Sequence, residues 1–243
     1  MSVRVVTGWV TAALIGSSVA AQALTLAEDG QARAVIVPPA EPIPAERTAV
    51  AELAAYLQKV TGAEFAEASA DPAPGTVRLL VGPSQATRAV LGDAAVDALG
   101  PEEIVIRTVG NDLVLCGGRP RGTLYAVYTF LQDALGCRWY AVDADEVIPR
   151  RPTLQVHDLA IRYQPCFEFR QHYTEALKDP LFAVKLRQNG REFSAPIPAE
   201  LGGTASMGGA HTLRRQFLKP DEHFKAHPDW YSLDKPGGER KPA

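Results

Sequence analysis

The sequence predicts an α/β (α+β) protein, with a small mixed sheet and helices packed on it, followed by an incomplete (β/α)8-barrel start. Short apolar runs alternate with helical periodicity through the middle of the chain, and glycines and prolines separate them. The pattern then restarts with a strand and a helix, but too few residues follow for the eight strand–helix units of a barrel. The 243 residues are enough to bury a sizeable core.

The first two strands and the helix between them have clear boundaries. Residues 34–37 form an apolar run of the kind that a buried strand shows, and residues 77–82 form a second one. Between them, apolar residues recur at intervals of three and four over 45–61, which predicts an amphipathic helix. Pro44 suits the start of this helix, and Gly62 suits its end.

The rest of the domain is expected to hold a hairpin flanked by helices. Gly110 and Asn111 lie between two apolar runs and predict a tight turn. The expected elements are, in chain order, a helical stretch over 84–99, strands over 103–109 and 113–116, a helix over 123–135, and short closing strands over 137–140 and 146–148.

The glycine-rich turn at 117–122 does not fit a nucleotide site. It lacks the Lys-Ser/Thr of a P-loop and the G-x-G-x-x-G spacing of a dinucleotide fold. Pro120 also removes a backbone N–H that a phosphate would need. We therefore predict a strand-to-helix turn in which the glycines supply unusual backbone dihedrals.

Residues 118–132 resemble the R-G-x-x-Y-G-x-x-T-L-L-Q helix of a known accessory domain. This domain precedes the catalytic barrel in bacterial β-hexosaminidases and, in related form, in α-glucuronidases. The helix end at Thr61-Gly62, the strand at 80–82 and the segment at 136–140 agree with it. The resemblance covers residues 30–160 and implies a domain that packs against a barrel and cuts no bonds itself.

On this basis the chain is expected to have three parts. Residues 1–23 form a signal peptide, residues 24–160 form the hexosaminidase/α-glucuronidase N-terminal-like domain, and residues 161–243 form the truncated, partly loop-like start of a barrel. The barrel start consists of an expected strand over 167–172 and a helix over 180–188. We expect a fragment, or a truncated gene product, of a longer enzyme-like protein; a natural short protein with a disordered tail is the alternative.

Two substrate-binding candidates come from the expected barrel strand. Residues 165–170 are similar to the P-R-F-x-x-R-G strand that begins the hexosaminidase barrel, although Gln171 replaces its glycine. In that strand the arginine holds sugar hydroxyls, so the resemblance implies that Arg170 contacts a carbohydrate, a task that suits the fixed donors of a guanidinium. Glu168 is the second candidate. The alternative is that Arg170 and Glu168 share a strand face and form an ion pair in the barrel mouth.

Histidines add a third substrate-binding candidate but no metal site. His211 follows a glycine-rich stretch after the expected helix, which would place it on a ligand-binding rim. His223 and His227 have the i, i+4 spacing of a metal pair, but the Glu of H-E-x-x-H is absent and Pro228 ends the helix. Residues 227–233 instead resemble an H-P-E-W-F segment of poorly characterised secreted bacterial proteins with the same N-terminal domain. We predict no metal and no cofactor.

Two functions stay open. The first is a fragment of a secreted glycoside-hydrolase-like protein that acts on polysaccharide or oligosaccharide, here its non-catalytic accessory domain with the first barrel elements. The second is a stand-alone non-catalytic carbohydrate-binding or scaffolding module. Glycoside cleavage normally needs two carboxyl groups, and no partner for Glu168 can be named. We nominate no catalytic residue and expect this chain alone to be inactive.

The N-terminus has the features of a secretory signal. Arg4 precedes an apolar stretch over 9–20, and Ala21-Gln22-Ala23 is an A-x-A pattern that predicts cleavage after Ala23. An uncleaved anchor is the alternative. We expect a secreted or periplasmic protein with a carbohydrate ligand and no membrane contact after cleavage. The net charge of −3 gives no footprint for nucleic acid, and the oligomeric state stays open.

Export would place the three cysteines in an oxidising compartment. Three cysteines are too few for a disulfide scaffold. Cys116 and Cys137 both lie in strand-like runs and could be neighbours, but we favour buried free thiols.

Overall fold

A computed structural model describes residues 23–68, 72–142, 146–172, 174, 178–190, 196–207 and 217–241. The described strands form a five-stranded sheet in the order β3-β4-β6-β5-β8 and a three-stranded sheet in the order β2-β1-β7. The strands are β1 Leu24–Glu28, β2 Gln31–Ala32, β3 Ala34–Val37, β4 Val77–Val81, β5 Ile104–Val109, β6 Asp112–Gly117, β7 Leu154–Val156 and β8 Ala160–Tyr163. All but the last residue of the predicted signal peptide lies outside the described ranges.

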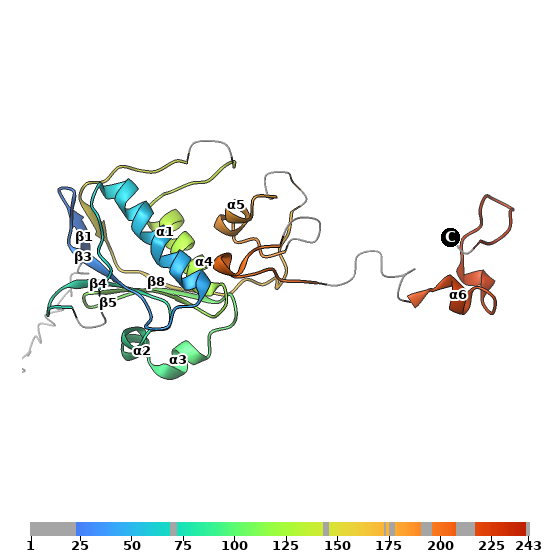
Figure 1. Cartoon of the computed structure of the whole chain (residues 1–243), viewed down its shortest axis with the longest axis horizontal. Coiled ribbons are helices and arrows are strands. Elements are labelled where there is room, and N and C mark those ends of the chain that lie inside the picture. The colour runs from blue at the N-terminus through green and yellow to red at the C-terminus, as the bar shows by residue number, and fades with distance from the viewer. Residues whose placement is uncertain are drawn as a thin grey trace, which may run out of the picture.

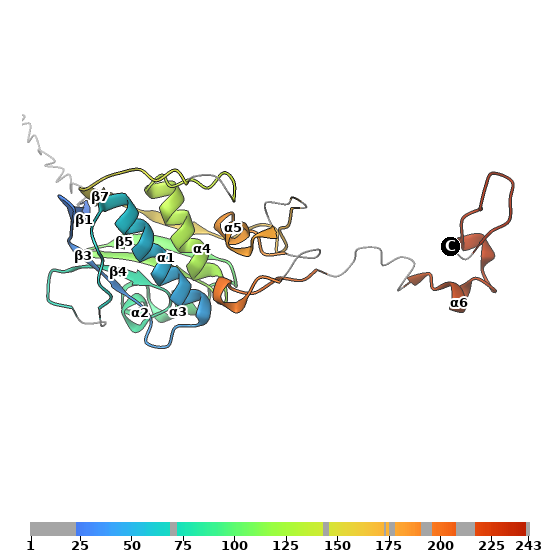
Figure 2. The same ribbon diagram turned by 45° about the horizontal axis from the view of Figure 1, so that its top comes forward.

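Helices cover both faces of the five-stranded sheet. Figures 1 and 2 show α1 and α4 side by side on one face and the shorter α2 and α3 on the other. The helices are α1 Pro44–Thr61, α2 Gln85–Leu91, α3 Asp93–Asp97, α4 Gly122–Thr129, α5 Pro180–Lys185 and α6 Pro220–His223. The predicted α/β fold class is confirmed, and no barrel is closed in the described part of the chain.

The five-stranded sheet is mixed. Strands β3, β4 and β6 run parallel, while β5 pairs antiparallel with β6 on one side and with β8 on the other. Side chains alternate between the two faces, so Leu79 and Val81 pack under α1 and α4, whereas Leu80 joins a smaller cluster that includes residues of α2 and α3. Because both faces are covered, these strands are apolar along their length.

The long helix α1 begins and ends where the sequence predicts. Pro44 lies in its first turn, where no N–H is needed for the helical ladder. The Glu46 side chain turns back and accepts a hydrogen bond from the Ile43 backbone N–H at 3.0 Å. Gly62 ends the helix in the left-handed conformation, with φ of 81°.

Three expected elements are altered in the structure. The helical stretch over 84–99 is broken at Gly92, whose φ of 89° cannot continue a helix. The helix over 123–135 continues past α4 as a π-helical turn at Phe130–Ala134. The expected strands over 137–140 and 146–148 are reduced to one antiparallel bridge between Arg138 and Val147.

The expected barrel strand over 167–172 is wrong, because these residues form no strand. The backbone N–H of Arg170 donates to the Asn189 side chain at 2.8 Å, and its carbonyl accepts from the N–H groups of Asn189 and Gly190. The backbone of Arg170 is therefore satisfied by a loop instead of a neighbouring strand. The expected helix over 180–188 ends at Lys185 as α5.

Strand β8 extends the five-stranded sheet into the region that was expected to begin the barrel. It pairs with β5 through Ile161 opposite Ile106, so the sheet continues to Tyr163, past the expected domain boundary at 160/161. The division into 24–160 and 161–243 stays a prediction, but the first three residues of the second part belong to the sheet of the first.

The cysteines are free. Cys116 and Cys137 are buried, and Cys166 is exposed. Cys116 belongs to the smaller core cluster, whereas Cys137 belongs to the larger one on the other face of the sheet. Burial raises the pKa of Cys116 to about 12 and that of Cys137 to about 11, so both thiols stay protonated near neutral pH. The buried pair therefore acts as apolar core side chains, as predicted.

The glycine-rich turn is structural, but the reason differs from the predicted one. Gly117, Gly118 and Gly122 all lie outside the left-handed backbone region. They are required because backbones approach closely: a Cβ on Gly118 would lie 1.7 Å from the Gly100 carbonyl oxygen, and one on Gly117 would lie 2.2 Å from the Gly122 carbonyl carbon. The turn thus brings the end of β6, the start of α4 and the loop before β5 together.

We expect Gly118→Ala to lower the free energy of unfolding by more than about 3 kcal/mol, since backbone must move to admit the methyl group. Gly75→Ala is the control, because a Cβ there has no neighbour within 4 Å and only the φ of 87° opposes it. The control substitution should lower the free energy of unfolding by about 1 to 2 kcal/mol. Urea unfolding followed by circular dichroism measures both, and equal losses would contradict the close-packing account.

Candidate functional site

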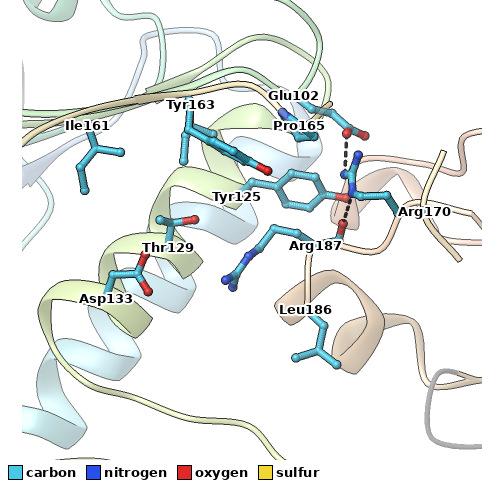
Figure 3. Close-up of a pocket in the computed structure, with 11 residues that line it drawn as sticks. Glu102, Tyr125, Thr129, Asp133, Ile161, Tyr163, Pro165, Arg170, Leu186 and Arg187 are labelled. Carbon is cyan, nitrogen blue, oxygen red and sulfur yellow. Dashed lines mark hydrogen bonds and ion pairs between the residues drawn. The ribbon is translucent and has the colours of Figure 1, made fainter. Parts of the chain in front are cut away.

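A cavity of about 490 Å³ lies between α4, β8 and the segments that flank α5 (Figure 3). It combines aromatic, charged and aliphatic side chains, as ligand pockets commonly do. The lining residues are Glu102, Ile104, Tyr125, Thr129, Asp133, Ile161, Tyr163, Pro165, Arg170, Leu186 and Arg187. We take this cavity as the candidate site.

A buried carboxylate, that of Glu102, anchors one end of the cavity. Its Oε1 accepts from Arg121 Nε at 2.7 Å and from Asn189 Nδ2 at 2.6 Å, and its Oε2 accepts from Arg170 Nη2 at 2.5 Å. Glu102 is only 8% exposed. The three donors come from the start of α4, the loop before α5 and the loop after it, so this one side chain joins all three segments.

Arg170 lies at the cavity, as expected of a ligand-contacting residue, but much of its guanidinium is used within the chain. Besides Glu102, its Nε donates to the Arg187 carbonyl at 2.9 Å and its Nη1 to the Phe167 carbonyl at 2.6 Å. The guanidinium also interacts with the hydroxyl of Tyr125. Its contact with a carbohydrate stays a prediction.

The other two candidates have separate outcomes. Glu168 is exposed, and its backbone carbonyl accepts from Asn189 Nδ2 at 2.7 Å. The alternative of an ion pair between Arg170 and Glu168 is wrong, because the carboxylate that binds Arg170 in the described structure is that of Glu102. His211 lies outside the described residues.

The sequence analysis did not single out Glu102, although the sequence contains an indication of its role. Glu102 and Glu103 stand directly before the apolar run of β5, and both are buried. Glu103 accepts from Arg162 of β8 at 2.6 Å. An acidic pair at the start of a strand is a signal for buried ion pairs, but no spacing rule connects it with arginines so distant along the chain.

Arg187 is the second arginine of the cavity, and its surroundings differ. Its Nη1 donates to the Lys185 carbonyl at 2.7 Å and its Nη2 to Gln132 Oε1 at 2.8 Å, and both acceptors are neutral. Burial lowers the pKa of Arg187, while the charge of Asp133 acts in the opposite direction. The backbone of Arg187 is left-handed, with φ of 57°, a conformation that non-glycine residues rarely adopt.

Tyrosines provide the aromatic part of the lining. Tyr125 is buried and its hydroxyl donates to the Gln188 carbonyl at 3.1 Å. Tyr163, on the edge strand β8, is 56% exposed. Figure 3 shows the rings of both tyrosines facing the same open space as Asp133 and Arg187. The cavity therefore has an exposed aromatic face beside hydrogen-bonding groups of both charges.

A second polar cluster fixes α5 to α1. Lys185 Nζ donates to Glu146 Oε1 at 2.6 Å and to the Tyr56 hydroxyl at 2.8 Å, and the Tyr56 hydroxyl donates to Glu146. Lys59 Nζ donates to Glu146 Oε2 at 3.0 Å. Burial alone would raise the pKa of Glu146, but these hydrogen bonds outweigh it and lower the pKa to about 2. Burial and the Glu146 contact raise the pKa of Tyr56.

His223 and His227, for which no metal site is predicted, lie in the C-terminal segment 217–241. Figures 1 and 2 show this segment apart from the α/β domain. The His227 ring stacks on Trp230 with centroids 4.0 Å apart and an interplanar angle of 4°. Across the described ranges, no group of three or more His, Cys, Asp or Glu side chains is placed to hold a metal ion. No helix in those ranges is long and apolar enough to span a bilayer.

Comparisons with known proteins identify no family. No protein family matches the sequence, and no curated protein matches it. A solved structure described as "A novel family GH115 4-O-Methyl-alpha-glucuronidase, BtGH115A, with specificity for decorated arabinogalactans" is similar to this chain, with a TM-score of 0.43 and 15% identity. The match covers 60% of this chain and spans only 19% of that protein.

We expect Glu102→Gln to lower the free energy of unfolding by about 3 to 5 kcal/mol, because two largely buried guanidiniums lose their carboxylate. Glu168→Gln is the control, since its side chain is exposed and a change there should cost less than about 0.5 kcal/mol. Urea denaturation of both variants gives the comparison. Equal stability of the two variants would show that the three-donor arrangement around Glu102 contributes nothing.

The low pKa of Glu146 predicts a pH-dependent contribution to stability. Because the pKa is lowered in the folded state, the contribution is complete above the ordinary value of 4.5 and is lost as the pH falls towards 2. Wild type should exceed Glu146→Gln by about 2 to 3 kcal/mol near neutral pH, and the difference should vanish near pH 2. Unfolding titrations across this range measure it, with exposed Glu28→Gln as control. A constant difference would contradict the assignment.

Proposed function

We propose that this chain is the non-catalytic accessory part of a secreted glycoside-hydrolase-like protein, and that the cavity beside β8 holds a saccharide unit. The sequence resemblance to hexosaminidase and α-glucuronidase accessory domains and the α/β fold support this proposal. The observation that carries it is the lining of the cavity, where exposed Tyr163 stands beside Thr129, Asp133 and Arg187.

The lining suits the chemistry of a sugar ring. A pyranose has C–H groups on its faces and hydroxyls around its rim, so it needs an aromatic face together with donors and acceptors. Tyr163 offers the face, Arg187 offers N–H donors and Asp133 offers acceptors. Arg170 lies at the same cavity, although most of its guanidinium already binds groups of the chain.

The same cavity is poorly equipped for bond cleavage. A glycosidase needs a carboxyl group that can give up a proton and a second one that acts as nucleophile or base. Glu102 is buried, and both of its oxygens already accept hydrogen bonds from side chains of the protein, two of which are the guanidiniums of Arg121 and Arg170. This leaves Asp133 as the one uncommitted carboxylate among the described lining residues. A binding role therefore fits better than a catalytic one.

A scaffolding module is the second candidate, and the contacts of Arg170 favour it. Three of its N–H groups donate within the chain and hold the loops around α5 in place. In that case the cavity is a by-product of packing, and the exposed ring of Tyr163 has no ligand. The two candidates differ in whether removal of that ring changes carbohydrate affinity.

Affinity gel electrophoresis with soluble polysaccharides tests the proposal. We expect at least one polysaccharide to retard the protein, and Tyr163→Ala to weaken this affinity about fivefold, because a stacked ring contributes on the order of 1 kcal/mol. Tyr140→Ala is the control, since Tyr140 is 74% exposed and lies outside the cavity lining. No retardation by any polysaccharide, or equal retardation of all three proteins, would favour the scaffold.

The absence of catalysis is tested on the same protein. Purified residues 24–243 should release no product from aryl glycosides above the buffer rate. Turnover that Glu168→Gln abolishes would overturn the non-catalytic assignment.

A further inference from the structure

The charges around the cavity do not balance. Glu102 carries one negative charge but binds two guanidiniums, those of Arg121 and Arg170, whose side chains are 11% and 17% exposed. Arg187 adds a third positive charge, and Asp133 supplies one more negative charge. Among the described residues, the cavity and its anchor therefore hold one excess positive charge. An excess charge in a partly desolvated site is costly unless a counter-ion reaches it.

Arg187 is the side chain through which a ligand can most readily reach the excess positive charge. No carboxylate of the described chain lies within 4.0 Å of its guanidinium, and its two assigned acceptors are neutral. Three of its five N–H groups remain without an assigned acceptor. By contrast, the partly buried Arg78 pairs with Asp112, and the exposed Arg119 pairs with Glu46.

The backbone holds Arg187 in this position against its own preference. Its left-handed φ of 57° costs about 1 to 2 kcal/mol for a residue with a side chain. Its N–H donates to the Val184 carbonyl at 2.8 Å, and its carbonyl accepts from Arg170 Nε at 2.9 Å. The residue is thus held from both sides, and its guanidinium is aimed into the cavity (Figure 3). This left-handed residue directly follows the C-cap of α5 and ends the helix, since the next N–H, that of Gln188, donates to the Ala183 carbonyl at 2.9 Å.

We infer that the cavity binds a ligand with a carboxylate group, and that the free N–H groups of Arg187 are its anion contact. A carboxylate matches the planar guanidinium with two parallel hydrogen bonds and cancels the excess charge. This inference deepens the proposed function and rests on it for the saccharide part of the ligand: the ring lies on Tyr163 and its carboxylate on Arg187. Asp133, which is exposed, faces the same space and selects against a second negative charge.

Isothermal titration of the whole chain at low ionic strength tests this inference with matched probes. The probes are galacturonic acid, its methyl ester, galactose and acetate. We expect galacturonate to bind at least about tenfold more tightly than the ester or galactose, and its affinity to fall as salt is added.

Variants assign the effect to one side chain. Arg187→Gly should abolish the preference for the acid, and glycine accepts the left-handed backbone without strain. Arg187→Lys keeps the charge and should retain part of the preference, which guards against a variant that fails to fold. Arg33→Gln removes one exposed positive charge elsewhere and should leave binding unchanged.

The outcomes separate the two proposals. Equal affinity for acid, ester and galactose would overturn the carboxylate inference and support a neutral-saccharide site. Binding of acetate that depends on Arg187, without binding of any sugar, would support the anion site and overturn the saccharide function. Binding of the acid that Arg187→Gly leaves unchanged, or no binding of any probe, would overturn the inference.

Discussion

The shape of the candidate site depends on one buried carboxylate, that of Glu102. Three donors from separate parts of the chain converge on it, and they fix the start of α4 relative to both loops around α5. Buried ion pairs contribute little net stability, because desolvation offsets most of the Coulomb attraction. Their effect is on geometry: through Arg170, the same cluster also sets the position of the Arg187 carbonyl and hence of its guanidinium.

Local periodicity predicted most of the α/β domain, and long-range pairing explains what it missed. Helix α1, strands β3 to β6 and the hairpin turn each carry their pattern within a short window, so their place could be predicted. Strand β8 was not predicted as part of the sheet, because its place there depends on pairing with β5, which is distant along the chain. At 167–172 the apolar pattern suggested a strand, but side-chain and loop hydrogen bonds satisfy the backbone instead.

The candidate site was only partly predictable for the same reason. Arg170 was found through a motif, yet its partner Glu102 lies 68 residues earlier, a separation that no local pattern encodes. Arg187 belongs to no sequence motif. It is distinguished by the lack of a carboxylate near its guanidinium among the described residues. Charge balance and hydrogen-bond accounting in three dimensions reveal such a residue, whereas composition cannot.

The position of β8 has a practical consequence for dividing this chain into smaller pieces. A truncation after residue 160 would keep only the first residue of the edge strand and would remove Arg162 and Arg170, which are bound to Glu103 and Glu102. The shortened protein would expose the hydrogen-bonding edge of β5, a surface prone to self-association. A soluble minimal unit therefore has to extend through the loops around α5, as far as Gly203 at least, whose carbonyl accepts from Arg121.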